Sequence, residues 1–133
     1  MEFVAWFTHK FVMHGFLWIL HEDHHRPHKG RFEKNDLFAF YFAGIAILFF
    51  ALGAFHGLII YTSIAIGVTL YGIGYFLFHD VMFHRRIKGF RIKASTPYLK
   101  RIIHAHSVHH QSTDKNKSTT FGFLYASKKY DIK

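Results

Sequence analysis

The sequence feature that most constrains the fold is an uncharged run, residues 37–78, which contains no Asp, Glu, Lys or Arg over 42 residues. About 18 consecutive apolar residues already predict a membrane helix, so this run is long enough for two. Gly53 and Gly57 interrupt it near the middle. We therefore expect a helical hairpin with membrane spans at residues 37–55 and 58–78.

The alternative for this run is a pair of buried core helices in a soluble protein. Such helices normally keep a polar stripe that faces water. No face of the run carries such a stripe, and 50% of the whole chain is hydrophobic, with 20% aromatic residues. The pattern therefore favours a membrane setting.

A third apolar segment, residues 3–20, precedes the hairpin and is interrupted by His9, Lys10 and His14. As a helix rising about 1.5 Å per residue, it crosses most of a bilayer. Ionisable side chains in such a segment should face a bundle interior, a cavity or the interface, although Lys10 can also extend to a headgroup. We expect one domain, residues 1–133, with an all-α fold: an integral membrane bundle of about three membrane helices.

Basic residues gather at one end of the predicted hairpin. The chain has 17 Lys and Arg against 8 Asp and Glu, a net charge of +9. Lys10 lies before the first histidine cluster, four basic residues lie between His25 and Leu37, and twelve follow Phe78. The positive-inside rule places this end at the cytoplasm, beside anionic headgroups, and no nucleic-acid-binding signature argues for another partner. We expect segments 21–36 and 79–110 to form a cytoplasmic, histidine-rich helical cap.

Ten of the 13 histidines follow a repeated pattern. A His-x-x-His-His triplet occurs at residues 21–25 and again at 106–110, and a pair five residues apart precedes each triplet. At about 100° per residue a triplet shares one helix face and predicts a local ligand patch, whereas the members of a pair stand about 140° apart. The hairpin returns the chain to the membrane side that it left, which should bring together His9, His14, His21, His24, His25, His79, His84, His106, His109 and His110.

Ten converging imidazoles fit two transition metals better than one, since such metals take about four to six ligands each. Cysteine is absent, so nitrogen and oxygen must hold any metal, and imidazole suits iron, zinc, copper and nickel alike. Carboxylates that can orient the histidine rings are Asp80, Glu22 and Asp23; for Glu22 and Asp23 the alternative is a solvated loop charge. The histidines outside the pattern are expected to be ordinary hydrogen-bonded or surface imidazoles: His28, His56 and His104.

The residues around these histidines resemble the membrane-bound fatty acid hydroxylase superfamily, and more closely the bacterial and plant β-carotene 3-hydroxylases. The likeness covers nearly the whole chain, and its strings are residues 9–15, 21–28, 32–37, 79–84, 106–110 and 121–125. The histidine spacing by itself indicates only the superfamily. Asn35, Asp36 and the string 121–125 point to the carotenoid branch.

The resemblance implies a non-haem di-iron centre that uses O2 to hydroxylate carotenoid β-ionone rings at carbon 3, converting β-carotene to β-cryptoxanthin and zeaxanthin. It implies that the ten histidines hold both iron ions and that no residue beyond these ligands is catalytic. It also implies a carotenoid drawn from the bilayer and electrons from a ferredoxin-type partner, in agreement with the lack of a flavin, nicotinamide or haem-attachment motif. Family members usually carry a further membrane helix ahead of the segment that begins here, so we expect that helix to be missing.

Two other functions are compatible with the sequence. The first is a hydroxylase or desaturase that acts on an acyl chain, a sterol or another carotenoid. The second is a non-enzymatic, histidine-rich membrane protein that handles metals, which would carry polar residues along its spans; residues 37–78 largely lack them. Product analysis separates the first alternative, and O2 consumption separates the second.

Overall fold

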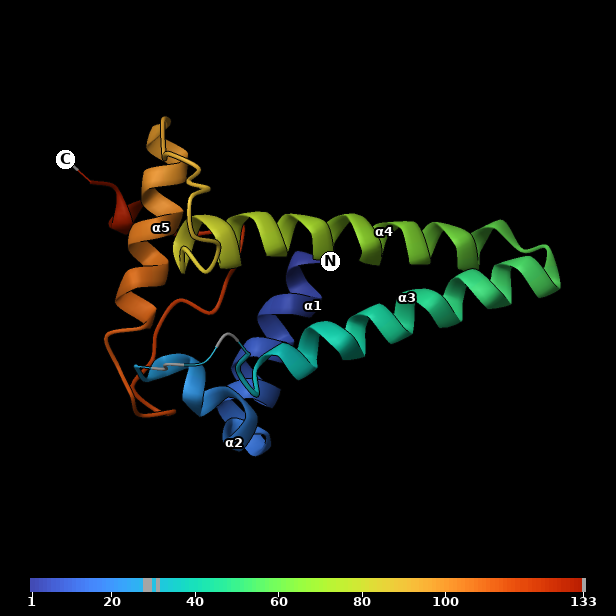
Figure 1. Ribbon diagram of the computed structural model, residues 1–133, viewed down its shortest axis with the longest axis horizontal. Helices are drawn as coiled ribbons and strands as arrows, with labels where there is room; N and C mark the ends of the chain where they lie inside the picture. The colour runs from blue at the N-terminus through green and yellow to red at the C-terminus, as the bar shows by residue number, and fades with distance from the viewer. Residues whose placement is uncertain (28–29, 31, 133) are drawn as a thin grey trace.

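The computed structural model describes residues 1–27, 30 and 32–132, and all the regular elements in that part of the chain are helical. A long hairpin extends to one side of a cap that the other elements form (Figure 1). The expected all-α fold is therefore confirmed. In chain order the elements are α1 (Glu2–Phe7), η1 (Thr8–Phe16), α2 (Trp18–His21), η2 (Glu22–His25), α3 (Asp36–His56), α4 (Ile59–Tyr75), η3 (Phe76–Phe83), α5 (Pro97–His109) and η4 (Lys128–Tyr130).

The hairpin consists of α3 and α4, and glycines shape its tip. Gly57 has a φ of +64°, and its N–H donates to the carbonyl of Gly53 at 2.9 Å, which ends α3. A Cβ added at Gly53 would collide with the side chain of Thr62 on α4. Glycine at position 53 therefore lets the two helices approach closely near the turn.

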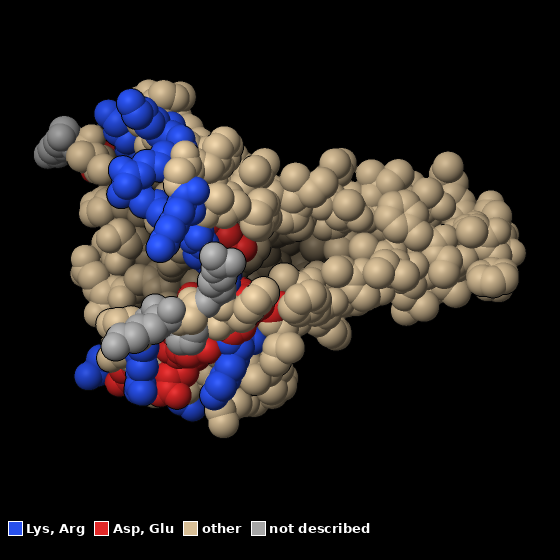
Figure 2. Space-filling view, viewed as in Figure 1, with Lys and Arg blue, Asp and Glu red and all other residues tan. Residues whose placement is uncertain are grey.

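Two helices of the described chain are long and apolar enough to cross a membrane: α3, and α4 together with η3, which continues it without a break. Their large side chains point outward, with Phe40, Phe55 and Ile59 exposed by 67%, 87% and 82%. In Figure 2 the charged side chains gather on the cap and at the base of the hairpin, and the rest of the visible hairpin is uncharged. This protein is therefore a membrane protein, and the helix that contains the predicted span 58–78 continues to Phe83.

The segment 3–20 is not the single helix that its composition predicted. Residues 2–16 form one arm and residues 18–25 a second, and the two arms meet at 106°, so they count as a third span only if taken together. The break occurs at Gly15, whose φ of −105° and ψ of −120° are not helical, and at Leu17, with φ −101° and ψ 24°. Across this bend the ring of His21 lies close to the rings of His9 and His14, with centroids 5.0 Å and 4.9 Å apart.

The carboxyl-terminal part of the cap packs on the end of η3. Helix α5 begins at Pro97, where the Thr96 hydroxyl accepts the backbone N–H of Leu99 at 3.2 Å. A small apolar core joins this helix to the end of the second span and to the tail: Met82, Ile102, Ala105, Ala126 and Tyr130. This packing fixes the second triplet next to the pair carried by η3.

Residue Glu2 ties the amino terminus to the tail. Its carboxylate accepts the backbone N–H groups of Phe123, Leu124 and Tyr125 at 2.8–3.1 Å, and the hydroxyl of Tyr71 on α4 at 2.6 Å. One side chain therefore holds together three segments that are far apart in the sequence.

Candidate metal centre

The ten histidines of the repeated pattern lie together in the cap, where they form two groups of five. We call the first group site A, made of His9, His14, His21, His25 and His109. The second group is site B, made of His24, His79, His84, His106 and His110. Within each group, one ring nitrogen of every histidine lies within 4.8 Å of the others.

Each triplet is divided between the two sites, contrary to the expected local patches. His21 and His25, one helical turn apart, belong to site A, whereas His24 belongs to site B. The second triplet mirrors this arrangement, because His109 crosses to site A and its neighbours remain in site B. Each site therefore combines one upstream pair, two members of its own triplet and the middle member of the other.

The two upstream pairs also differ from the expectation that 140° separates their members. His9 and His14 lie in the π-helical segment η1, and His79 lies in η3 with His84 directly after its last residue. Backbone hydrogen bonds in such segments join residues five apart, and the N–H of His84 donates to the carbonyl of His79 at 2.9 Å. The wider turn places both rings on one face, with centroids 4.5 Å apart for this pair and 5.1 Å for His9 and His14.

Seven of the ten rings donate a hydrogen bond from Nδ1 to an oxygen. Four of these oxygens are backbone carbonyls, which accept from His9, His14, His25 and His109 at 2.8–3.2 Å. The other three are side-chain oxygens: Asn35 for His21 at 2.6 Å, Glu33 for His24 at 2.7 Å and Asp80 for His79 at 2.9 Å. A neutral imidazole that donates from Nδ1 keeps an unprotonated Nε2 with a free lone pair.

These lone pairs point at one another. The Nε2 atoms of His14 and His109 are 3.1 Å apart in site A, as are those of His24 and His79 in site B. Two unprotonated nitrogens cannot form a hydrogen bond with each other, but a cation between them can bind both lone pairs. Nitrogens bound at about 2.1 Å to one ion, with angles of about 90–110°, stand about 3.0–3.4 Å apart, which matches these pairs.

A further nitrogen of site B lacks a partner in the described structure. Nε2 of His110 is buried and makes no hydrogen bond there. A buried polar atom without a partner is costly unless an ion or water satisfies it. The donor set and its geometry therefore fit a metal ion in each site.

Burial keeps the rings outside the spans neutral. It lowers the pKa of His84 to about 4, assisted by the positive charge of Arg86, and it lowers the pKa of His109 to about 3. Burial and then neighbouring imidazoles lower the pKa of His106 and of His110 as well. At neutral pH these nitrogens are therefore free to bind a metal ion.

The carboxylates named from the sequence divide into two kinds. Asp80 accepts from the ring of His79, the orienting contact that was expected. Glu22 pairs with Arg26 at 2.6 Å, and Asp23 accepts the backbone N–H of Lys34 at 2.7 Å. The described contacts of these two carboxylates are therefore not with histidine rings.

Two oxygens that do orient rings were missed: those of Glu33 and Asn35. Asn35 directly precedes α3, but its side chain makes no capping bond and accepts from His21 instead. The only signal was that both residues lie in the string 32–37, which resembles the carotenoid branch.

The histidines outside the repeated pattern lie outside both sites, as far as the structure describes them. His104 donates to the carbonyl of Tyr130 at 2.9 Å. His56 ends α3 at the far tip of the hairpin, with its ring 6.3 Å from that of Tyr61. His28 lies outside the described residues.

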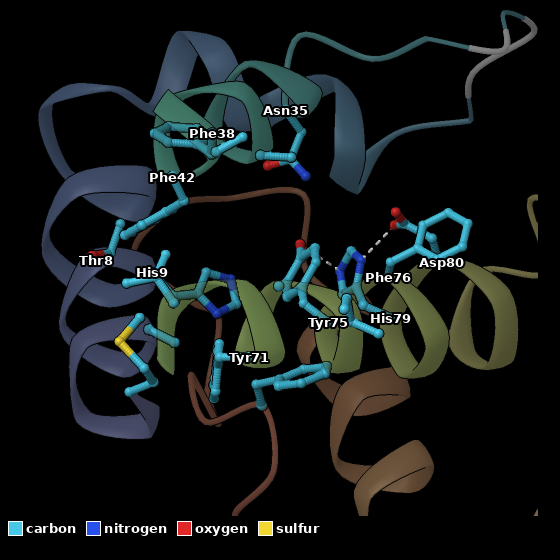
Figure 3. A pocket seen from close by; sticks show the side chains of 18 of the residues that line it. Thr8, His9, Asn35, Phe38, Phe42, Tyr71, Tyr75, Phe76, His79 and Asp80 are labelled. Carbon is cyan, nitrogen blue, oxygen red and sulfur yellow. Dashed lines mark hydrogen bonds and ion pairs between the residues drawn. The ribbon is translucent and has the colours of Figure 1, made fainter. Parts of the chain in front are cut away.

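A cavity of about 790 Å³ lies between the hairpin helices and the amino-terminal arm (Figure 3). Its walls are mostly apolar and include Phe38 and Phe42 of α3 and Phe76 at the start of η3. Its polar end contains histidines of both sites: His9, His21, His79 and His106. Pockets of about 300–1,000 Å³ hold drug-sized molecules, so an apolar group as large as a ring can enter beside the metal sites.

Comparisons with known proteins find relatives over nearly the whole chain. The fatty acid hydroxylase family profile matches residues 1–127. The chain is 46% identical over 132 residues to the "Beta-carotene hydroxylase" of Pseudescherichia vulneris, covering 99% of this chain and 74% of that protein. It is 44% identical to the "Beta-carotene hydroxylase" of Pantoea ananas over 126 residues, covering 95% of this chain and 71% of that protein.

A plant relative is also similar. The chain is 38% identical over 134 residues to the "Beta-carotene 3-hydroxylase 1, chloroplastic" of Arabidopsis thaliana, covering 98% of this chain and 42% of that protein. No solved structure matches. The resemblance seen in the sequence is confirmed, and the chain belongs to the fatty acid hydroxylase family.

Proposed function

We propose that this protein hydroxylates the β-ionone rings of carotenoids at carbon 3, taking β-carotene through β-cryptoxanthin to zeaxanthin. The reaction uses O2, and the ten histidines of sites A and B hold two iron ions. One observation carries this proposal: an apolar cavity at the base of a membrane hairpin ends at histidines of both metal sites. The names of the similar proteins support carotene as the substrate.

The overall reaction needs an outside source of electrons. One ring C–H, one O2, two electrons and two protons give one C–OH and one water. When bound, the two iron ions would supply the O2 activation that side chains alone cannot provide. Imidazole does not select iron over zinc, copper or nickel, so the choice of iron rests on the family.

The chain itself holds the ligands and excludes water. Asp80, Glu33 and Asn35 fix the orientation of three rings, so that each Nε2 points into its site. The apolar cavity walls keep water away from the substrate ring, and the exposed hairpin sides face the lipid in which carotenoids dissolve. The chain's role is thus placement, orientation and desolvation.

A ferredoxin-type protein is the proposed electron donor. A second cavity, of about 750 Å³, reaches His84, His106 and His110 of site B from the other side of η3. Its rim carries four exposed cations, Arg85, Arg91, Lys93 and Lys100, and none of the ion pairs among the described residues involves them. A positively charged mouth above a metal site suits an acidic redox protein.

The cap and its histidines are proposed to face the cytoplasm. Both basic segments flank the base of the hairpin, where anionic headgroups and the positive-inside rule favour the cytoplasmic side. Labels that cannot cross the membrane should then reach residues 26–36 and 85–132 from the same side.

Expression in a host that accumulates β-carotene tests the function. We expect β-cryptoxanthin and zeaxanthin with the unaltered chain and with His56→Ala, and neither product with His109→Ala. Absence of hydroxylated carotenoid from protein that carries both metal ions would contradict the proposal. A modified acyl chain or sterol would support the first alternative, and metal exchange without O2 consumption would support a metal-handling protein.

A further inference from the structure

Residue Tyr75 stands where the substrate cavity meets site B. Its ring stacks on that of His79, with centroids 4.3 Å apart and 20° between the planes, and its hydroxyl lies 3.2 Å from Nε2 of His79 (Figure 3). The same side chain lines the cavity. A phenol therefore reaches the nitrogen that faces the metal site, although the sequence pattern gave it no role.

The hydrogen-bond partners of this hydroxyl are few. Nδ1 of His79 donates to Asp80, so Nε2 is an acceptor and Tyr75 donates to it. Asn35 is a second polar neighbour of this side chain. The Asn35 oxygen accepts from His21 at 2.6 Å, so its described hydrogen bond is to site A rather than to Tyr75.

Metal binding by His79 removes the acceptor that Tyr75 uses. Once Nε2 of His79 shares its lone pair with an ion, it cannot also accept a hydrogen bond. The hydroxyl proton is then free to turn toward the cavity that the Tyr75 side chain lines. The hydroxyl group then becomes a hydrogen-bond donor at the reacting end of the substrate pocket.

We propose that Tyr75 is a catalytic residue that donates a hydrogen bond to the oxygen being placed on the substrate ring. This role rests on the proposed hydroxylation. It differs from the role of the histidines, because Tyr75 is not a metal ligand. Its hydroxyl can act only after metal binding by His79 has broken the hydrogen bond between the two side chains. Donors aimed at an oxygen in a water-excluded site contribute strongly to catalysis.

A matched control lies on the same helix but outside the cavity. Tyr61 of α4 is near the hairpin turn, where its ring lies 6.0 Å from that of Phe49, and it is not among the residues that line the substrate cavity. Tyr75→Phe and Tyr61→Phe each remove one phenol hydroxyl from α4 and keep the aromatic ring. The two variants separate the proposed hydrogen bond from a general effect of losing a hydroxyl on this helix.

The first measurement is a titration of the metal-free protein with Co²⁺ alone, followed by visible absorption. Because Tyr75 competes for Nε2 of His79, we expect Tyr75→Phe to bind Co²⁺ about two- to tenfold more tightly at one site, the worth of one ordinary hydrogen bond. Tyr61→Phe should match the Co²⁺ affinity of the unaltered protein. Unchanged or weaker Co²⁺ binding by Tyr75→Phe would overturn the exchange of partners, whether or not the protein hydroxylates carotenoids.

The second measurement is turnover of β-carotene by the iron-loaded protein in detergent or lipid. For Tyr75→Phe we expect kcat to fall by about tenfold or more, with KM within about threefold, because the lost contact is made to the reacting oxygen. Tyr61→Phe, outside the cavity, should keep both constants within about threefold. An unchanged kcat in Tyr75→Phe would overturn the catalytic role, whereas absence of turnover in the unaltered protein alongside tighter Co²⁺ binding would contradict only the proposed function.

Discussion

His25 of site A and His110 of site B stack face to face, with ring centroids 4.4 Å apart and 18° between their planes. The two rings form a shared wall between the sites. Since close packing transmits any shift of one ring to the other, the two metal sites are parts of one structure rather than independent ligand patches. The division of both triplets between the sites has the same consequence.

Replacing the middle histidine of a triplet should damage the site that it crosses into. We expect His24→Ala to leave the same residual metal species as His79→Ala, and His109→Ala the same species as His14→Ala, judged by metal content and by Co²⁺ absorption. All four variants should lose hydroxylation by at least about 100-fold, because a metal site with a missing ligand does not assemble.

The control is His56→Ala, at the far tip of the hairpin, whose hydroxylation rate should stay within about twofold of that of the unaltered protein. If His24→Ala resembled His21→Ala rather than His79→Ala, the assignment of ligands to two mixed sites would be wrong.

Removing an oxygen that orients a ring should weaken metal binding without removing a ligand. We expect Glu33→Gln to lower metal affinity by about 10- to 100-fold, because the carboxylate that accepts from Nδ1 of His24 raises the basicity of that ring. Metal affinity is measured by competition with a chelator. Glu22→Gln is the matched control, since Glu22 pairs with Arg26 rather than with a ring, and equal losses in both variants would refute this role for Glu33.

Acid should destabilise the metal-free protein over a defined range. Burial lowers the pKa of His84 to about 4 and that of His109 to about 3, whereas in the unfolded chain both lie near about 6.5. The unfolded state therefore binds more protons below pH 6.5. The contribution of these rings is fully present above that pH and is lost as the pH falls toward 4 and then 3.

Thermal unfolding in detergent, at steps between pH 7.5 and pH 4, measures this effect. We expect the Tm of the metal-free protein to fall steadily below about pH 6.5, and the affinity for metal to fall with it. A Tm that stays constant from pH 7 to pH 4.5 would show that these rings are not buried as the structure has them.

Reversing charge at the mouth of the second cavity should weaken binding of the electron donor and leave the metal sites unchanged. We expect the double variant Lys93→Glu and Lys100→Glu to raise KM for reduced ferredoxin by about tenfold and to lower its salt dependence. The rate with dithionite as the donor should stay unchanged. The matched control is Lys128→Glu with Lys129→Glu, which changes the net charge equally outside this cavity; similar KM values in the two double variants would exclude docking at the cavity.

The hairpin and the set of ten histidines could be predicted from the sequence because both depend on local composition. The uncharged run requires a nonpolar environment. Because a hairpin returns the chain to the membrane side that it left, the two halves of the histidine pattern come together. The exchange of His24 and His109 between the sites could not be predicted, because spacing along a helix does not reveal which neighbouring segment each ring faces. The π-helical turns of η1 and η3 could not be predicted either, because the prediction assumed the α-helical rotation of about 100° per residue.

Tertiary contacts account for the remaining differences between the sequence prediction and the structure. Asn35 occupies the N-cap position of α3, yet the first triplet packs against it and its side-chain oxygen accepts a hydrogen bond from His21. The bend at Gly15 and Leu17 turns an apparent third straight span into two arms, and this bend is what makes the contact of His21 with Asn35 available.

The most direct test of the two-site account is the metal content of the purified protein, combined with Mössbauer spectroscopy of iron incorporated during expression. Sites A and B predict two iron ions per chain and a signal from two coupled irons. One ion per chain, or two ions that show no coupling, would contradict a shared centre built from both histidine triplets.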